Sequence, residues 1–282
     1  MKTLLPLTLI GLFSASAQAA ELDITITNAT GGIAFTPLAV ATHQAGINIY
    51  QIGAKASGGL TALAEGGNTA GVISEINQSG YGYAKQYNPE GGLTLPGQGY
   101  QFSIDTMDYE YLSLAAMLLP SNDGFVGLNS WKIPTKAGSY TIKLNGYDAG
   151  TELNDEIVNG GGAPGVAGIP AAPTGMQQTG AEMYPYLSET GYVHIHPGIV
   201  GDTDSQGGYS DLDSRVHRFL NPVANITITV KQDAVMAWDG EQVEYQVDEQ
   251  VTYMDVVYKV VHAHTSSPTW TPSNVWFFEA IE

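Results

Sequence analysis

Short runs in which apolar and polar residues alternate recur along this chain, and turn-forming residues separate them. The run LDITITN at 22–28 is the clearest, and NITITVK at 225–231 repeats the pattern. A period of two residues is that of a β-strand with one buried face. Further strands are expected at 38–41, 47–52, 100–104, 111–118, 125–128, 139–144 and 191–196, with short helices at 60–65 and 70–78. This spacing of strands and turns predicts an all-β, antiparallel sandwich.

The first 19 residues have the pattern of a secretory signal peptide. One lysine precedes an apolar run at 4–13, and the segment ends in the small residues Ala17-Gln18-Ala19. We therefore expect 1–19 to be removed on export, which places the protein in the periplasm or outside the cell. No later apolar stretch is long enough to span a membrane, so the exported chain is expected to be soluble.

Cysteine content and charge limit what can stabilise this protein and which classes of partner it can bind. The chain has no cysteine, 10 basic residues and 28 acidic ones, for a formal charge of -18. Without disulfides, its stability must come from the core or from a bound metal. The excess of acid argues against nucleic acid or an anionic membrane as partner. It is compatible with divalent cations.

Two acidic loops lie at the ends of expected strands. Asp123 is in the turn at 120–124, and Asp148 and Glu152 are in the loop at 147–156 among many other oxygen donors. Oxygen donors crowded on loops suit a hard cation such as Ca²⁺. Asn, Asp and Gly are also ordinary turn formers, so turn chemistry alone is the alternative.

Four of the six histidines form two His-x-His pairs, His194 with His196 and His262 with His264. Residues two apart on a strand project from the same face, so each pair can offer two imidazoles to one Cu²⁺ or Zn²⁺ ion. The alternative is that these side chains satisfy backbone groups or face solvent.

The sequence contains no nucleophile elbow, no cysteine nucleophile and no His-Glu-x-x-His zinc motif. Paired hydrolase carboxylates remain an alternative in so acidic a chain. Tyrosines in loop-like sequence are candidates to line a protein-binding or carbohydrate-binding surface. They are Tyr81, Tyr83, Tyr87, Tyr184, Tyr186 and Tyr209.

Six segments, taken in order, resemble the spondin N-terminal domain family in its bacterial branch. They are ITITNAT at 24–30, LAVATH at 38–43, MLLPSNDGFVG at 117–127, YDAGTELNDE at 147–156, YVHIHPGI at 192–199 and NPVANITI at 221–228. The resemblance extends over about 22–230. It implies a C2-like antiparallel sandwich of about eight strands that serves adhesion and partner binding and not catalysis.

The resemblance also implies a Ca²⁺ site. Carried over residue by residue, its ligands are Asp123, Asp148 and Glu152, with Asn122 and Asp155 as further contributors.

His43 lies in a matched segment, as do His194 and His196, so His43 is the candidate third ligand for copper or zinc. Animal members of the family often have Trp after the Asp of the first turn, where this chain has Gly124, and they carry cysteines that are absent here.

The chain is expected to divide into a signal peptide at 1–19, a sandwich at 20–232 and a C-terminal β extension at 233–282. We expect the extension to dock on the sandwich, because its aromatic residues at 276–278 need burial. The leading hypothesis is an exported, non-enzymatic, Ca²⁺-binding module for adhesion or partner binding. The alternatives are a periplasmic copper-binding protein and an unrecognised hydrolase, and the oligomeric state is open.

Overall fold

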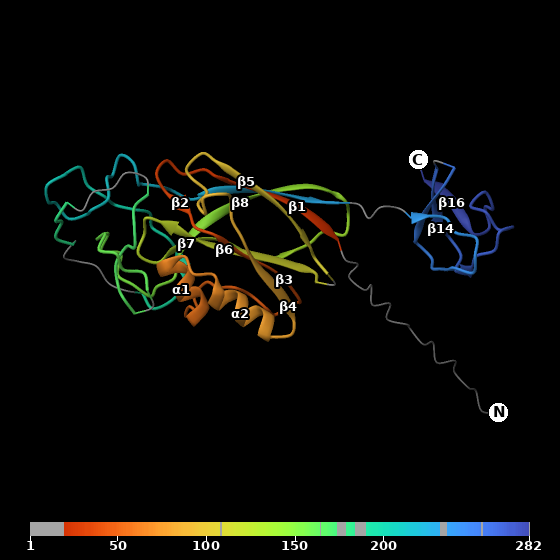
Figure 1. Cartoon of the computed structure of the whole chain (residues 1–282), viewed down its shortest axis with the longest axis horizontal. Coiled ribbons are helices and arrows are strands. Elements are labelled where there is room, and N and C mark those ends of the chain that lie inside the picture. The colour runs from red at the N-terminus through yellow and green to blue at the C-terminus, as the bar shows by residue number, and fades with distance from the viewer. Residues whose placement is uncertain are drawn as a thin grey trace, which may run out of the picture. The chain divides into compact units, whose positions relative to one another are not determined.

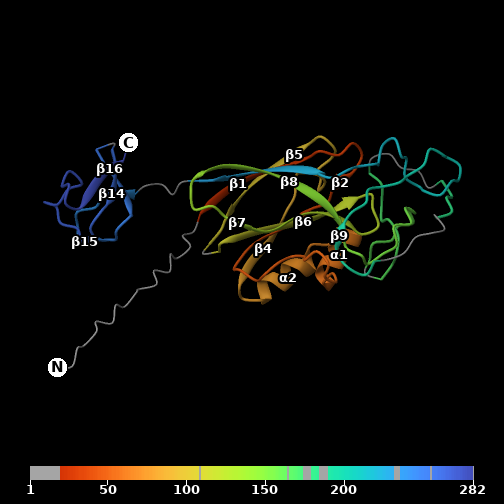
Figure 2. The ribbon, with the colours of Figure 1, turned by 180° about the vertical axis from the view of Figure 1, so that it is seen from behind.

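The chain falls into two compact units, Met1–Lys231 and Gln232–Glu282. The computed structural model describes residues 20–107, 109–163, 165–173, 179–183, 190–231, 236–254 and 256–281 (Figures 1 and 2). The predicted signal peptide, Tyr184 and Tyr186 lie outside the described residues. No described helix is long and apolar enough to cross a membrane.

The first unit is an antiparallel β-sandwich, which confirms the predicted fold class. Its strands follow the order β4-β3-β6-β7-β8-β10-β1-β5, with β2 paired to β6 and β9 paired to β8. The strands are β1 (Glu21–Asn28), β2 (Ala34–Phe35), β3 (Leu38–His43), β4 (Gly82–Tyr87), β5 (Gly99–Asp105), β6 (Tyr111–Leu119), β7 (Gly124–Lys132), β8 (Gly138–Asp148), β9 (His194–Ile195) and β10 (Ala224–Val230).

The two layers of the sandwich separate between β7 and β8. Strand β7 pairs with β6 from Phe125 to Lys132, but it pairs with β8 only from Gly124 to Gly127. Beyond Gly127, β7 stays with β6 while β8 continues with β10. The short shared ladder therefore joins the two layers at one end, beside the first acidic turn.

The alternating pattern of β1 and β10 produces the core between the layers. Leu22, Ile24 and Ile26 are fully buried, as are Ile226 and Ile228 on the neighbouring strand. The residues between them on β1 and β10 are partly or fully exposed. Each such buried aliphatic side chain contributes about 1.5–3 kcal/mol, so this face fixes the register of the strands.

Two helices, α1 (Gly58–Gly66) and α2 (Ala70–Gln78), confirm the short helices expected at 60–65 and 70–78. Ser57 caps α1 by accepting a hydrogen bond from the Leu60 amide at 3.1 Å. The apolar faces of the helices cover the outer side of β3 and β6, as Figure 1 shows. Strand β6 is therefore buried on both faces, which explains its apolar run from Leu114 to Leu119.

The connections on either side of β9 gather at the end of the sandwich that carries the acidic turns (Figures 1 and 2). The strand expected at 191–196 contains only His194 and Ile195, paired with Asp148 and Tyr147 of β8. This short pairing carries the histidine segment to the acidic loops.

The second unit has a small core of its own. Its strands are β11 (Met236–Ala237), β13 (Gln250–Tyr253), β14 (Val256–Val260) and β16 (Phe278–Ile281) in one sheet, and β12 (Glu244–Tyr245) with β15 (His264–Thr265) in another. Tyr245, Val251, Val260 and Phe278 form the buried cluster. The expectation that all the aromatic residues at 276–278 are buried is wrong for Trp276, which is 65% exposed. Docking of this unit on the sandwich stays a prediction.

Candidate functional site

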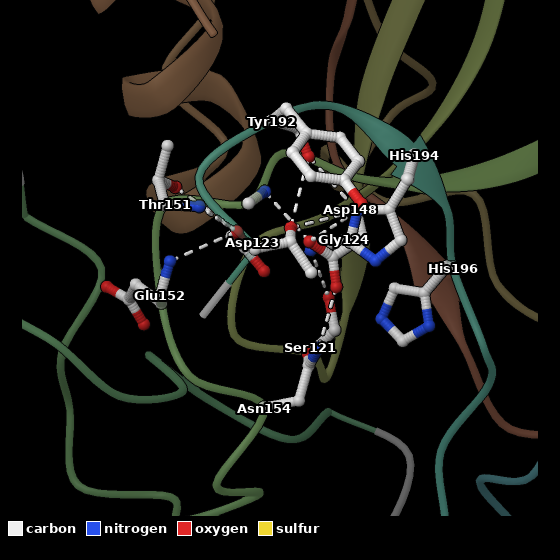
Figure 3. Close-up of polar contacts among 12 residues, drawn as sticks. Ser121, Asp123, Gly124, Asp148, Thr151, Glu152, Asn154, Tyr192, His194 and His196 are labelled. Carbon is white, nitrogen blue, oxygen red and sulfur yellow. Dashed lines mark hydrogen bonds and ion pairs between the residues drawn. The ribbon is translucent and has the colours of Figure 1, made fainter. Parts of the chain in front are cut away.

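Asp123 and Asp148 form a buried pair of carboxylates at the joined end of the sandwich (Figure 3). Asp123 ends the turn between β6 and β7, and Asp148 is the last residue of β8. The β7–β8 ladder pairs Gly124 with Asp148, and the Ala149 amide donates to the Asp123 carbonyl at 3.1 Å. The backbone ladder therefore determines that the two side chains lie together.

Only one carboxylate oxygen of Asp123 is hydrogen-bonded within the described part of the chain. Its Oδ2 accepts from the Thr151 amide at 2.7 Å and from the Glu152 amide at 3.2 Å. Its Oδ1 is buried and has no partner among the described residues. Burial, with a further contribution from the negative charge of Asp148, raises the pKa of Asp123 to about 6. A cation at Oδ1 would satisfy this oxygen and offset both effects.

Asp148 is held by groups from its own loop and by the histidine segment. Its Oδ1 accepts from the Gly150 amide at 2.8 Å, and its Oδ2 accepts from Asn154 Nδ2 at 2.6 Å. His194 Nδ1 lies 3.6 Å from Asp148 Oδ1 and donates to the Tyr192 carbonyl at 3.1 Å. Because a carbonyl oxygen can only accept, the hydrogen of neutral His194 is on Nδ1 and its Nε2 can bind a metal.

His196 is buried beside Asp148, and its ring hydrogen is on the other nitrogen than in His194. Its Nδ1 accepts from the Gly198 amide at 2.9 Å, so Nε2 carries the hydrogen. That Nε2 is buried without a partner in the described structure. Burial lowers the pKa of His196 to about 4, although Asp148 opposes this shift. In this tautomer His196 Nε2 would have to lose its hydrogen before it could bind a metal.

Gly124 makes room for this histidine. A Cβ at Gly124 would lie 2.6 Å from Ser121 Oγ and 2.9 Å from His196 Cδ2. Animal members of the resembled family often have Trp at this position. In this chain the position is adjacent to the imidazole of His196, which is distant in sequence.

His43 is not brought to this end of the sandwich. It pairs with Tyr111 at the start of β6, whereas the acidic turn follows Leu119 at the other end of that strand. Eight strand steps of about 3.3 Å separate the two ends by roughly 26 Å. Both ring nitrogens of His43 have partners, the Gln44 carbonyl and Ser113 Oγ, each at 2.8 Å. The structure therefore does not bring the three predicted copper ligands together.

The remaining predicted Ca²⁺ ligands lie near the pair but are directed elsewhere. Glu152 Oε2 accepts from the Gly168 amide at 2.9 Å, and Figure 3 shows its carboxylate turned away from Asp123. Burial raises the pKa of Glu152 to about 7. Asn122 Nδ2 donates to Asp155 Oδ1 at 2.8 Å, so these two side chains bind each other.

Across the described ranges, no group of three or more His, Cys, Asp or Glu side chains is arranged to hold a metal ion. The fit to Ca²⁺ therefore depends on Asp123 and Asp148. Two carboxylates with an unsatisfied oxygen match the chemistry of a hard cation, which takes the rest of its 6–8 ligands from other oxygens. Sequence reasoning did not identify Thr151 and Asn154, which orient the two carboxylates.

The second unit presents exposed aromatic side chains. Trp276 is 65% exposed and Trp270 is 42% exposed. The two histidines of this unit contact different rings. His262 stacks on Trp276 with centroids 5.0 Å apart, and His264 lies against Phe277 at 4.3 Å with the ring planes tilted by 32°. The sequence-predicted His262–His264 pair is thus part of an aromatic cluster. The exposed tryptophans were not predicted, because burial is the ordinary expectation for such residues.

The first unit is therefore an antiparallel β-sandwich with a loop-built pair of buried carboxylates at one end. Residues 26–155 match the family model Spondin_N, so this part of the chain belongs to the spondin N-terminal domain family, as the first four of the six segments indicated. The segments at 192–199 and 221–228 lie beyond the matched residues.

Residues 237–276 match the carbohydrate-binding module family 5/12. A comparison with curated proteins finds no relative that matches the chain. The two family matches indicate a binding protein of the extracellular kind.

Proposed function

We propose that this protein is an exported, non-enzymatic adhesion protein whose C-terminal unit binds a polysaccharide. The observation that carries the proposal is the exposure of Trp276 and Trp270 in a unit that matches a carbohydrate-binding module. The apolar face of a pyranose ring stacks on an exposed indole, as amphipathic aromatic surfaces commonly do in recognition. Exposed apolar residues that form a contiguous patch commonly mark a binding site.

The test is a depletion assay with the full chain and insoluble chitin, cellulose and xylan. We expect the wild type to bind at least one of them and Trp276→Ala to lower that affinity by roughly tenfold or more, as hot-spot truncations do. Met254→Ala is the matched control, because Met254 is an exposed apolar residue, 79% accessible, in the same unit. Failure of the wild type to bind any of the three would overturn the proposal.

We further propose that the sandwich binds Ca²⁺ through Asp123 and Asp148. The support is the unpartnered Asp123 Oδ1 beside a second buried carboxylate. Two neighbouring negative charges in a buried site cost free energy, and a divalent cation bound between them would offset this cost. Ca²⁺ would then order the loops of this end, which form the surface offered to a protein partner.

The cation proposal is tested by thermal unfolding in Ca²⁺ and in a chelator. A ligand at 100 times its Kd stabilises the native state by about 2.7 kcal/mol, which corresponds to roughly 5–10 °C for a unit of this size. Asp123→Asn should remove this Ca²⁺ response, and Glu90→Gln, an exposed acid of the same unit, should retain it. An identical melting temperature in Ca²⁺ and chelator would contradict the proposal.

The copper hypothesis stays a prediction with fewer ligands to support it. In this structure it has His194 Nε2 and the carboxylates, since His43 lies at the other end of β6 and His196 carries its hydrogen on Nε2. Metal analysis of protein purified without added metal separates the two cation hypotheses.

A further inference from the structure

His262 and Trp276 form a nearly parallel stack on the surface of the second unit. Their ring centroids are 5.0 Å apart, and the ring planes differ by 7°. Both side chains are exposed, so the stack is not a consequence of burial in the core. One face of the Trp276 indole is therefore covered by the imidazole, and the opposite face is left for a ligand.

A hydrogen bond holds the same two residues together. His262 Nδ1 donates to the Trp276 main-chain carbonyl at 2.5 Å. The Trp276 amide in turn donates to Asn274 Oδ1 at 3.1 Å. The imidazole thus contacts both the ring and the backbone of Trp276.

The β14–β16 ladder places the histidine where it can make these contacts. Val260 pairs with Phe278, and the Val261 amide donates to the Phe277 carbonyl at 2.8 Å. His262 and Trp276 are the next residues outward on the two segments. Their contact continues the end of the sheet and fixes the segment that carries the indole.

The other histidine of this pair packs against several aromatic rings other than Trp276. His264 lies closest to Phe277, with centroids 4.3 Å apart, and its Nδ1 donates to the His262 carbonyl at 2.8 Å. This bond orients the backbone of His262 from the other side. The two imidazoles thus pack against different aromatic rings. Binding of one metal ion by both histidines would not require these contacts.

We propose that His262 is a positioning residue that fixes the Trp276 ring as a rigid platform for the apolar face of a pyranose. This inference depends on the proposed polysaccharide binding of the same unit. An exposed indole without support samples several rotamers, and binding must then restrict it at a cost in affinity. The stacked imidazole restricts the ring before the sugar arrives, while contacting the sugar is left to Trp276.

Full-chain variants tested on the polysaccharide that the wild type binds can isolate this role. We expect His262→Ala to weaken binding by roughly 3- to 10-fold, the range for one side chain that must be ordered on binding. His262→Phe keeps a flat ring behind the indole and should stay within about twofold of the wild type. Gln246→Ala, an exposed polar residue of the same unit, is the control for folding and handling. Equal affinity of His262→Ala and the wild type would overturn the proposal, as would equally weak binding by His262→Ala and His262→Phe.

A fluorescence readout separates this proposal from the function on which it depends. Quenching of tryptophan emission by acrylamide should increase in His262→Ala, and this increase should disappear when Trp276→Ala is added. If the wild type binds no polysaccharide but this quenching difference is present, the proposed function fails while the support of Trp276 by His262 is retained. If binding and its loss in Trp276→Ala are both found without any effect of His262→Ala, only the positioning role is lost.

Discussion

The end of the sandwich and the surface of the second unit offer binding groups of opposite kinds. The first buries charge, with Asp123 and Asp148 at most 1% exposed. The second exposes apolar rings, with Trp276 the most exposed tryptophan at 65%. Each arrangement is unfavourable in the protein alone, and each would become favourable with the ligand that we propose for it, a cation in one case and a sugar ring in the other.

The two sites also differ in what orients their side chains. At the sandwich end, backbone amides of the loop that follows β8 bind Asp123 and Asp148, and the β7–β8 pairing holds the start of that loop. In the second unit a small core supports the surface, and side-chain stacking orients the indole. A site built from backbone groups should tolerate substitutions of the surrounding side chains, whereas the aromatic site should depend on single side chains.

The largest expected effect comes from removing the core of the second unit. Phe278 is 2% exposed, and truncation to Ala should cost about 3–5 kcal/mol, more than so small a core can lose. Calorimetry should show the loss of this unit's transition and an unchanged transition of the sandwich. Val275→Ala, at a position 87% exposed, is the control. A matching decrease in the sandwich transition would show that the two units unfold together.

Adding one methyl group at Gly124 should have the next largest effect. The new Cβ would lie 2.6 Å from Ser121 Oγ, so Gly124→Ala should lower the free energy of unfolding of the sandwich by about 1–3 kcal/mol. Thermal unfolding measures this loss. Gly99→Ala adds the same group at 3.5 Å from Thr27 Oγ1, an ordinary contact, and should have little effect. Equal stability of the two variants would contradict the role given to Gly124.

Removing one of the two buried charges should stabilise the cation-free sandwich. In chelator at pH 7, Asp123→Asn should raise the free energy of unfolding by up to about 2 kcal/mol, because burial and Asp148 raise the pKa of Asp123 to about 6 from 3.8. A raised carboxyl pKa means that the native state binds the extra proton between about pH 4 and 6. The advantage of Asn over Asp should therefore shrink as the pH falls through 6 and vanish near 4.

Denaturant titrations of the wild type and Asp123→Asn at several pH values measure this difference. Subtracting the two proteins cancels His196, whose lowered pKa destabilises the native state as the pH falls. A variant less stable than the wild type in chelator at pH 7 would contradict the prediction.

The smallest expected effect is at His194. Its side chain is 27% exposed and lies 3.6 Å from Asp148, so His194→Ala should change the free energy of unfolding by less than about 0.5 kcal/mol. Copper titration of the same variant compares the cation hypotheses. Loss of tight copper binding in both His194→Ala and His196→Ala would favour copper and contradict the assignment of a hydrogen to His196 Nε2.

Local pattern was sufficient to predict much of the fold. The alternation at 22–28 and at 225–231 indicated half-buried strands, and the structure pairs these two segments directly. Helices α1 and α2 also follow from short-range signals, including the Ser57 cap and the Gly67 end in left-handed conformation. These features depend on residues a few positions apart, which the sequence displays.

Pairs of residues far apart in the chain were predicted less well. The acidic turns at Asp123 and Asp148 were recognised from the sequence. The direction of the Glu152 carboxylate, away from Asp123, depends instead on its hydrogen bond from the Gly168 amide. His43, His194 and His196 have the same residue type, yet only the strand register decides which of them reaches the carboxylates. Register and loop packing are tertiary properties, so residue type alone does not give them.

The sequence by itself thus determined an antiparallel β-sandwich and two acidic turns, because strand period, turn residues and charge are local properties of the chain. Only the tertiary structure decided that Asp123 and Asp148 share a buried site, that His196 occupies the space beside Gly124, and that His262 supports an exposed Trp276. These three facts depend on which segments pack together, and packing is set by the free energy of the whole fold and not by any one stretch.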